Sequence, residues 1–310
     1  MWLKKIEDSR PGEAIDLVYS PENLRLGQAL SLFKRPDMII IGAASERARK
    51  KAGEFYRPFA AEKIFTSLKT AEMAKHALNA FFATSVSFAN ELGNICEAVG
   101  ADGLQIAKIL QKDGRIGAKA QVRPGLGFAG ATLARDLRVL QKLGRREGVA
   151  TGLFDSVLEI NGQRNARVVK LIEDSFGGRM RGKTISILGL TYKPGTSTLR
   201  RSSSLEIMKS LHSKGARILA HDPKADMSEY PGRPFFEFFA DAYGACRSSD
   251  AILLLTEWPE YKELDYLEIK KSMNRPLILD AKNHLDEAKL EGLGFDYQLI
   301  GRGRPREGMR

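Results

Sequence analysis

The sequence predicts an α/β protein in which an all-helical stretch separates two regions of alternating strands and helices. Short apolar runs typical of strands alternate with helical patterns over residues 1–68 and again beyond residue 182. Between these regions, apolar residues recur at helical spacing and no strand pattern is present. These patterns predict three domains, at residues 1–68, 69–176 and 177–310.

The first region contains the elements of only part of a sheet domain, because three short strands and two helices make a small core. The predicted elements are strands at 15–19, 38–41 and 63–65 and helices at 27–33 and 45–56. Glu22 follows the first strand, and α/β sheets keep their chemistry at such strand ends. A carboxylate that only favours the start of the next helix is an equally good interpretation.

A long amphipathic helix is predicted at residues 70–99, followed by helices at 136–143 and 152–176. Lys75 and Asn79 are four residues apart and therefore share one face of the long helix. A Lys beside an Asn on an otherwise apolar helix suggests a functional pair. The alternative is a Lys whose aliphatic stem lies along apolar surface while its amine reaches water.

The segment from Arg115 to Asp136 is a glycine-rich loop that ends at a helix starting near Thr132. Glycines let the backbone approach a ligand closely, and N–H groups at a helix start favour an anion. The loop therefore predicts an anion-binding turn, with Gly125 and Gly127 as binding residues. The alternative is a loop whose glycines only cap helices. A formal G-x-G-x-x-G ends at Gly130, but no strand precedes it, which argues against a dinucleotide fingerprint.

The third region predicts a parallel, doubly wound sheet, because continuous apolar strands alternate with helices. The predicted strands are 184–188, 217–221, 251–256, 277–280 and 297–300, and the predicted helices are 203–213, 235–247 and 266–273. The turn after the first of these strands, GLTYKPG, is not a dinucleotide fingerprint. Lys193 and Arg200 follow that strand and are expected at the carboxyl edge of the sheet, where ligands bind.

Composition is that of a globular protein, with 310 residues and a formal net charge of +11. The excess positive charge suits nucleic acid, a membrane surface or a phosphorylated small molecule. Basic residues are spread along the chain, which argues against a dedicated nucleic-acid domain. Cys96 and Cys246 lie in apolar helical stretches and are expected in the core, and no metal-ligand spacing is present. No signal region or long apolar run is found, so a cytoplasmic protein without membrane association is expected.

Eight stretches in sequence order resemble the UDP-glucose/GDP-mannose dehydrogenase family and together span nearly the whole chain. They are SPENLRLG at 20–27, TAEMAKHALNAFFATSVSFANELGNICEAVGAD at 70–102, RIG at 115–117, PGLGFAG at 124–130, GKTISILGLTYKP at 182–194, DP at 222–223, TEW at 256–258 and DAKN at 280–283. The resemblance implies a Rossmann-like N-terminal segment, a helical dimerisation domain and a C-terminal Rossmann-like domain that binds UDP.

The chain departs from the family pattern in two places. Family members begin with an NAD-binding Rossmann domain, and residues 1–68 correspond to its last part only. The family's catalytic loop carries a cysteine, and Thr132 stands at that position. The resemblance implies oxidation of the C6 alcohol of UDP-glucose, a precursor of polysaccharides, with NAD as cofactor and a thioester on the cysteine. A Thr hydroxyl is far less acidic than a thiol and is not expected to support the thioester.

The resemblance also implies roles for other residues. Lys75, Asn79 and Asp136 would stabilise the developing oxyanion and position water, and Glu22 would assist acid–base chemistry. The substrate-binding residues would be Gly125, Gly127, Lys193, Lys282 and Arg115. Of these, Arg115 would reach the substrate of a neighbouring subunit, which implies a homodimer. Arg200 matches an Arg that contacts the cofactor.

Two other functions are compatible with the sequence. A catalytically inactive relative that binds a UDP-sugar would retain the nucleotide pocket without the cysteine. A basic scaffold for nucleic acid is supported by the net charge alone. The sequence favours the dehydrogenase family and does not decide between turnover and binding.

Overall fold

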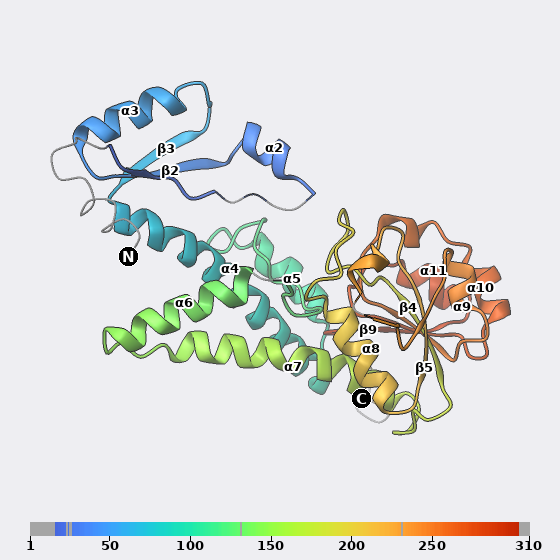
Figure 1. Cartoon of the computed structure of the whole chain (residues 1–310). Helices are drawn as coiled ribbons and strands as arrows, with labels where there is room; N and C mark the ends of the chain where they lie inside the picture. The colour runs from blue at the N-terminus through green and yellow to red at the C-terminus, as the bar shows by residue number, and fades with distance from the viewer. Residues whose placement is uncertain (1–15, 23, 25–26, 131, 231, 304–310) are drawn as a thin grey trace. The chain divides into compact units, whose positions relative to one another are not determined.

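The computed structural model describes residues 16–22, 24, 27–130, 132–230 and 232–303. Their contacts divide the chain into two compact units, one up to Asn79 and the other from Ala80 onward. The helix α4 (Leu68–Val99) contributes residues to both units. Figure 1 shows the elements of each unit.

The first unit is a three-stranded sheet with one packed helix. β2 (Met38–Ala43) is the apolar run MIIIGA and lies between β1 (Val18–Tyr19), which is antiparallel to it, and β3 (Glu62–Thr66), which is parallel. α3 (Glu46–Tyr56) begins after Ser45, whose side chain caps the helix, and buries Ala48 and Ala52. α2 (Ala29–Lys34) completes the unit and has no buried residue. The two predicted helices and the second and third predicted strands are confirmed. Of the first predicted strand, at 15–19, only Val18–Tyr19 is a strand, and Ile15 lies outside the described residues.

The helical part of the second unit contains four helices. After α4 come α5 (Gly103–Lys112), α6 (Thr132–Arg146) and α7 (Gly152–Asp174). The sequence did not resolve α5, whose start is capped by the carboxylate of Asp102. A small core of alanine, leucine and valine side chains holds α4, α6 and α7 together. Residues 113–130 form the loop between α5 and α6, and no strand precedes its glycines, so the dinucleotide fingerprint is rejected there.

The rest of the second unit is a six-stranded parallel sheet in the order β6-β5-β4-β7-β8-β9. Numbered along this sheet, the order is 3-2-1-4-5-6, which is that of a Rossmann fold. The strands are β4 (Thr184–Leu188), β5 (Arg217–His221), β6 (Glu237–Phe238), β7 (Ala251–Leu254), β8 (Leu277–Asp280) and β9 (Asp296–Leu299). The apolar runs of β4, β5, β7 and β8 are buried, as a doubly wound sheet requires, whereas both residues of the edge strand β6 are exposed.

Helices cover both faces of this sheet (Figure 1). Side chains of α7 and α8 (Ser203–Ser213) pack in one core cluster with β4, β5, β7 and β8. A second cluster joins the sheet to the remaining helical elements, which are α9 (Ala242–Cys246), η2 (Pro259–Lys262), α10 (Tyr266–Ser272) and α11 (Glu287–Gly292). A short 3-10 helix, η1 (Met227–Glu229), follows β5. Cys96 and Cys246 are both buried, as expected.

One predicted element is wrong. Residues 235–247, predicted as a helix, contain the edge strand β6 and the short helix α9. The carboxylate of Asp241 accepts a hydrogen bond from Gly244 N at 2.7 Å, so α9 starts at Ala242 instead of at Phe235. Phe236 is buried in the core before the strand begins. The helix N-cap at Asp241 therefore divides the segment into a strand and a helix, which the spacing of its aromatic residues did not reveal.

Candidate functional site

The carboxyl edge of the six-stranded sheet is organised by two buried aspartates. Asp222, directly after β5, accepts hydrogen bonds on Oδ2 from Leu190 N at 2.8 Å, Thr191 N at 2.9 Å and Trp258 Nε1 at 3.0 Å. These bonds fix the turns that follow β4 and β7, the two strands where the strand order reverses. Ligands of doubly wound sheets bind in the crevice at that reversal.

Asp280 has the corresponding role at the end of β8. Its carboxylate accepts hydrogen bonds from Lys282 N, His284 N, Leu285 N and Tyr297 Oη at 2.7–2.9 Å. This bonding fixes the turn that carries Lys282. The Lys282 amine forms an ion pair with Glu257 at 2.8 Å, and Glu257 follows β7. The turns after β7 and β8 are therefore linked by a charge pair at the sheet edge.

Basic residues follow several strands at this edge of the sheet. Lys193, in the turn after β4, lies 5.7 Å from the Tyr192 ring centre. Lys224, after β5, lies 5.8 Å from the indole ring of Trp258. With Lys282, three amines come from the carboxyl ends of three different strands. Such an arrangement suits a phosphorylated ligand, because the amines supply positive charge and donors from several sides.

The glycine-rich loop is held from both sides by polar side chains, of which Asn90 and Arg164 are buried. Asn90 of α4 accepts from Gly125 N at 2.9 Å, and Arg164 of α7 donates to Gly125 O through Nε at 3.0 Å and Nη2 at 2.8 Å. Burial lowers the pKa of Arg164 to about 10, so this guanidinium stays charged at neutral pH. Asn161 bonds both the N–H and the C=O of Phe128, at 2.7 and 3.1 Å.

The same loop is tied to the sheet edge. Asn283, which has a φ of 52°, donates from Nδ2 to Pro124 O at 2.9 Å and to Ile300 O at 3.1 Å. The backbone of the glycine-rich loop thus has a defined position relative to the turn that carries Lys282. We call Asn90, Asn161, Arg164 and Asn283 the loop clamp. None of the four was predicted as a site residue, because each looks like an isolated polar interruption of a helix or turn.

The other sequence-predicted residues of the second unit are spread more widely. Thr132, the first residue of α6, is exposed, whereas Asp136 is buried one turn further on. Arg135 Nε lies 3.1 Å from Asp136 Oδ1. Arg200 is exposed beyond the turn after β4. Arg115 is almost fully exposed and forms a two-point ion pair with Asp113, which raises the pKa of its guanidinium.

Within the first unit, the structure brings Glu22 and Lys75 together. The Lys75 amine donates to the backbone carbonyl of Glu22, while the Glu22 carboxylate accepts from Leu24 N at 2.5 Å. Asn79 lies one turn along α4 from Lys75 and is partly buried. Glu22 also borders a cavity of about 180 Å³ that is lined by Phe33, Tyr56 and neighbouring residues. The lysine thus fixes the backbone that carries the predicted carboxylate.

Two family models match the chain in the regions just described. The model of the central domain of the UDP-glucose/GDP-mannose dehydrogenase family matches residues 69–163, and the model of its UDP binding domain matches residues 186–287. UDP-glucose 6-dehydrogenase of Rhizobium meliloti (strain 1021) is 33% identical over 302 residues, which cover 96% of this chain and 69% of that protein. The chain belongs to the UDP-glucose/GDP-mannose dehydrogenase family.

Other members of the family are also matched over nearly the whole of this chain and over about two thirds of their own length. UDP-glucose 6-dehydrogenase TuaD of Bacillus subtilis (strain 168) is 37% identical over 292 residues, and the chain spans 62% of its length. A UDP-glucose dehydrogenase from Pyrobaculum islandicum has a similar structure, with a TM-score of 0.86 and 28% identity over 97% of this chain and 67% of that one. A UDP-D-ManNAc dehydrogenase from Pyrococcus horikoshii has a TM-score of 0.82 at 25% identity, over 97% of this chain and 68% of that one.

The structure distinguishes two glycines of the family's PGLGFAG stretch. A Cβ on Gly127 would lie 2.4 Å from Asn161 Oδ1, whereas a Cβ on Gly125 would meet only Ala281 O at 3.6 Å. We expect Gly127→Ala to lower the free energy of unfolding by about 1–3 kcal/mol, because either the clash or the loss of the Asn161 bonds must be accepted. Gly125→Ala, the matched control, is expected to change it by less than about 0.5 kcal/mol.

Urea unfolding of the two variants beside the parent chain measures both values. Equal destabilisation by the two alanines would contradict the assignment of Asn161 as a clamp on this part of the loop.

Proposed function

We propose that this chain binds a UDP-sugar, with UDP-glucose as the first candidate, at the carboxyl edge of its six-stranded sheet. The observation that carries the proposal is the set of three lysines, Lys193, Lys224 and Lys282, that follow the carboxyl ends of three strands of one sheet, together with the bond that ties the glycine-rich loop to the turn after β8. The match of residues 186–287 to the family's UDP binding domain supports the same assignment.

The chemistry proposed for the bound sugar is that of the relatives, oxidation of the C6 alcohol towards the uronate. Asp136 would take part in proton transfer or orient water, and the pair of Lys75 and Asn79 would stabilise negative charge on the reacting oxygen. Glu22 would assist acid–base steps. The contact of the Lys75 amine with the Glu22 backbone supports a shared role for these two residues.

Thr132 favours a second candidate function, binding of a UDP-sugar without turnover. A hydroxyl at this position cannot form the thioester through which a cysteine would carry the aldehyde to the acid. The hydroxyl of Thr132 is exposed at the start of α6, and Arg135 supplies positive charge nearby. A single oxidation to the aldehyde or its hydrate remains compatible with this residue.

NAD is the cofactor that family membership implies, and the described residues do not provide its usual cradle. Within residues 16–22, 24, 27–130, 132–230 and 232–303, no strand is followed by a G-x-G-x-x-G turn and a helix. Arg200, the predicted cofactor contact, is exposed after the turn that follows β4. The described residues therefore do not support a specific hydride-transfer step.

A homodimer through the helical domain is also proposed. On α4, Phe81, Phe88, Ile95 and Val99 are spaced by seven, seven and four residues and are 77%, 49%, 54% and 70% exposed. Large apolar side chains in such a row on one helix are typical of an interface. We also propose that the chain consists of three domains, at residues 1–68, 69–176 and 177–310. No helix among the described residues has the length and hydropathy that a membrane span requires.

The proposal is tested by thermal unfolding with added ligand. A ligand present at 100 times its dissociation constant stabilises the folded state by about 2.7 kcal/mol. We therefore expect millimolar UDP and UDP-glucose to raise the melting temperature by several degrees, and glucose alone to have no effect. An unchanged melting temperature with both nucleotides would contradict the site. Adding NAD with UDP-glucose and following NADH absorbance then separates turnover from binding.

A further inference from the structure

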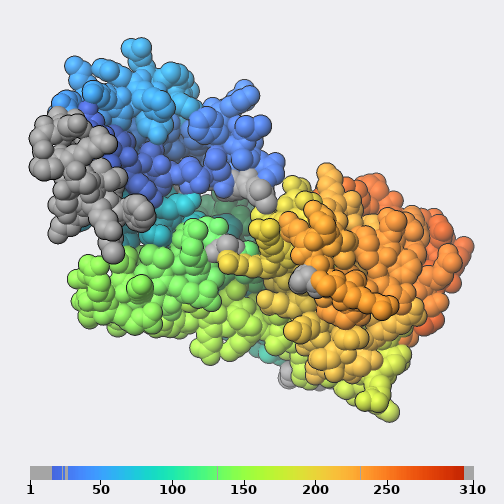
Figure 2. All heavy atoms as spheres, viewed as in Figure 1, coloured from blue at the N-terminus to red at the C-terminus, as the bar shows by residue number. Residues whose placement is uncertain are grey.

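The larger unit contains a cavity that the lysines of the sheet edge do not line. It has a volume of about 590 Å³ and is bordered by α6, α7, the glycine-rich loop and the start of α8. Figure 2 shows this face, where green atoms of the helical part border yellow atoms of the segment between β4 and α8. Neither Lys193 nor Lys282 lines the cavity.

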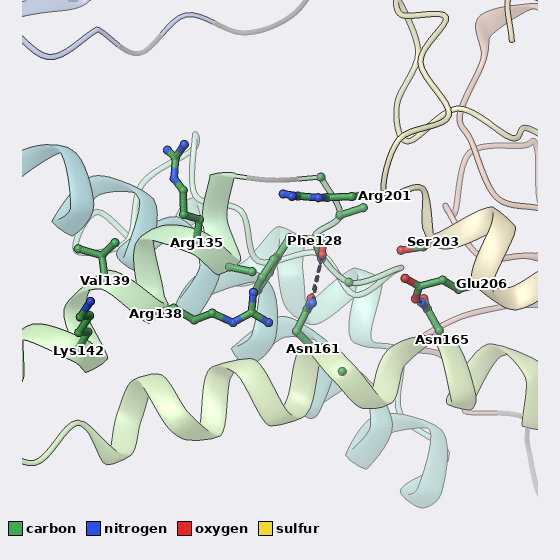
Figure 3. A pocket seen from close by; sticks show the side chains of 15 residues that line it. Phe128, Arg135, Arg138, Val139, Lys142, Asn161, Asn165, Arg201, Ser203 and Glu206 are labelled. Carbon is green, nitrogen blue, oxygen red and sulfur yellow. Dashed lines mark hydrogen bonds between the residues drawn. The ribbon is translucent and has the colours of Figure 1, made fainter. Parts of the chain in front are cut away.

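The cavity is strongly basic. Arg135, Arg138 and Lys142 occupy positions i, i+3 and i+7 of α6 and therefore share one face of the helix. Arg201 adds a fourth cation from the loop before α8. In Figure 3, Arg138 and Arg201 extend towards Phe128 from different elements. Four basic residues thus line one cavity of the size that holds a small ligand.

Few carboxylates of the protein neutralise the charge of these cations. Among the described residues, Arg138, Lys142 and Arg201 form no ion pair; Arg135 pairs with Asp136 on its own helix. The single carboxylate in the cavity lining is that of Glu206, whose Oε2 accepts a hydrogen bond from Asn165 at 2.6 Å. Like charges three or four residues apart on one helix face, as in Arg135, Arg138 and Lys142, destabilise the helix and the fold unless an anion lies between them.

The backbone supports this arrangement. Arg201 has a φ of 55°, a conformation that side-chain-bearing residues rarely adopt, and its carbonyl accepts from Gly130 N at 3.3 Å. Phe128 is held by both polar groups of Asn161, so an aromatic ring has a fixed place in the wall. Val139 and Ala134 add apolar surface. The cavity therefore combines fixed apolar walls with convergent donors.

We propose that this cavity binds a small, multiply charged phosphate compound at a site separate from the nucleotide-sugar crevice. Guanidinium groups match phosphate oxygens with two parallel hydrogen bonds, and the ammonium of Lys142 adds charge without fixed geometry. The two sites share the glycine-rich loop, because Gly127 lines the cavity while Asn283, in the turn after β8, bonds the carbonyl of Pro124. The proposal does not depend on nucleotide-sugar binding.

The test is calorimetric titration of the whole chain with inorganic pyrophosphate. In the variant Arg138→Gln/Lys142→Gln we expect binding at least about tenfold weaker, because two of the cationic side chains that line the cavity are replaced by neutral ones. The matched control Arg145→Gln/Arg146→Gln removes the same charge from the same helix outside the cavity. It is expected to bind pyrophosphate within about twofold of the parent chain. The charges it removes lie outside the cavity and act on the bound anion only over long distances, where salt screens them.

Two results would overturn the proposal. Equal weakening in both double variants would mean that pyrophosphate responds only to net charge. Displacement of pyrophosphate by saturating UDP-glucose would place it in the nucleotide-sugar crevice instead. Failure of UDP-glucose to bind leaves the comparison of the two double variants intact, so this proposal and the proposed function fail separately. All four substituted side chains are exposed, and an unchanged melting temperature confirms that the variants are folded.

Discussion

Replacement of Arg164 by methionine is expected to lower the free energy of unfolding by about 3–5 kcal/mol, because a buried charged donor with several partners is removed. Arg164 is 1% exposed and donates to Gly125 O twice and to Asn94 Oδ1 at 2.5 Å. Methionine keeps most of the apolar stem but leaves both acceptors without this donor in a buried setting. The glycine-rich loop should lose its position at the same time.

Chemical unfolding measures the loss, with Lys170→Met as the matched control. Lys170 is on the same helix, and its side chain is 60% exposed in an ion pair with Asp174. Removing that surface pair should cost no more than about 0.5 kcal/mol. A loss below about 1 kcal/mol for Arg164→Met would show that the loop does not depend on this guanidinium.

Substitution Asp222→Ala is expected to have a comparable effect on the sheet edge. Its carboxylate accepts hydrogen bonds from Leu190 N, Thr191 N, Trp258 Nε1 and Lys224 N at 2.8–3.0 Å. Each buried donor left without an acceptor costs about 1–3 kcal/mol, so a total of about 3–5 kcal/mol is expected. The turns after β4 and β7 would no longer be joined, and stabilisation by UDP-glucose should be lost.

The control for this variant is Asp241→Ala. Asp241 caps the short helix α9 through one hydrogen bond to Gly244 N, and losing such a cap costs about 1 kcal/mol. Melting temperatures with and without UDP-glucose distinguish the two cases. If Asp222→Ala keeps the ligand-dependent shift of the parent chain, Asp222 does not organise the binding crevice.

Most of the sheet could be predicted from the sequence, because continuous apolar runs such as Thr184–Leu188 and Leu277–Asp280 have few other interpretations. The edge strand β6 has two residues and shows no period, so the aromatic residues before it were assigned to a helix. The start of α9 depends on the cap at Asp241, which is decided by local hydrogen bonding rather than by periodicity.

The candidate site was predicted less completely. The place of Lys193 at the sheet edge could be predicted from topology, because it follows a strand end, whereas Lys282 was implied only by the resemblance to the family. The loop clamp depends on contacts between distant segments: Asn90 and Arg164 meet Gly125 across 35 and 39 residues of sequence. The sequence signal for the loop clamp is a polar Asn or Arg on an otherwise apolar helix face that packs near a glycine-rich loop. Its meaning depends on the packing of α4 against α7, which no local pattern encodes.

Calorimetric titration of the purified chain with UDP-glucose, and separately with NAD, tests the central claim most directly. We expect saturable UDP-glucose binding that is lost in Asp222→Ala and retained in Asp241→Ala. Binding of NAD as well would reveal a cofactor site among residues that carry no dinucleotide fingerprint. The absence of UDP-glucose binding at millimolar concentration would contradict the claim that the sheet edge and its clamped loop form a nucleotide-sugar site.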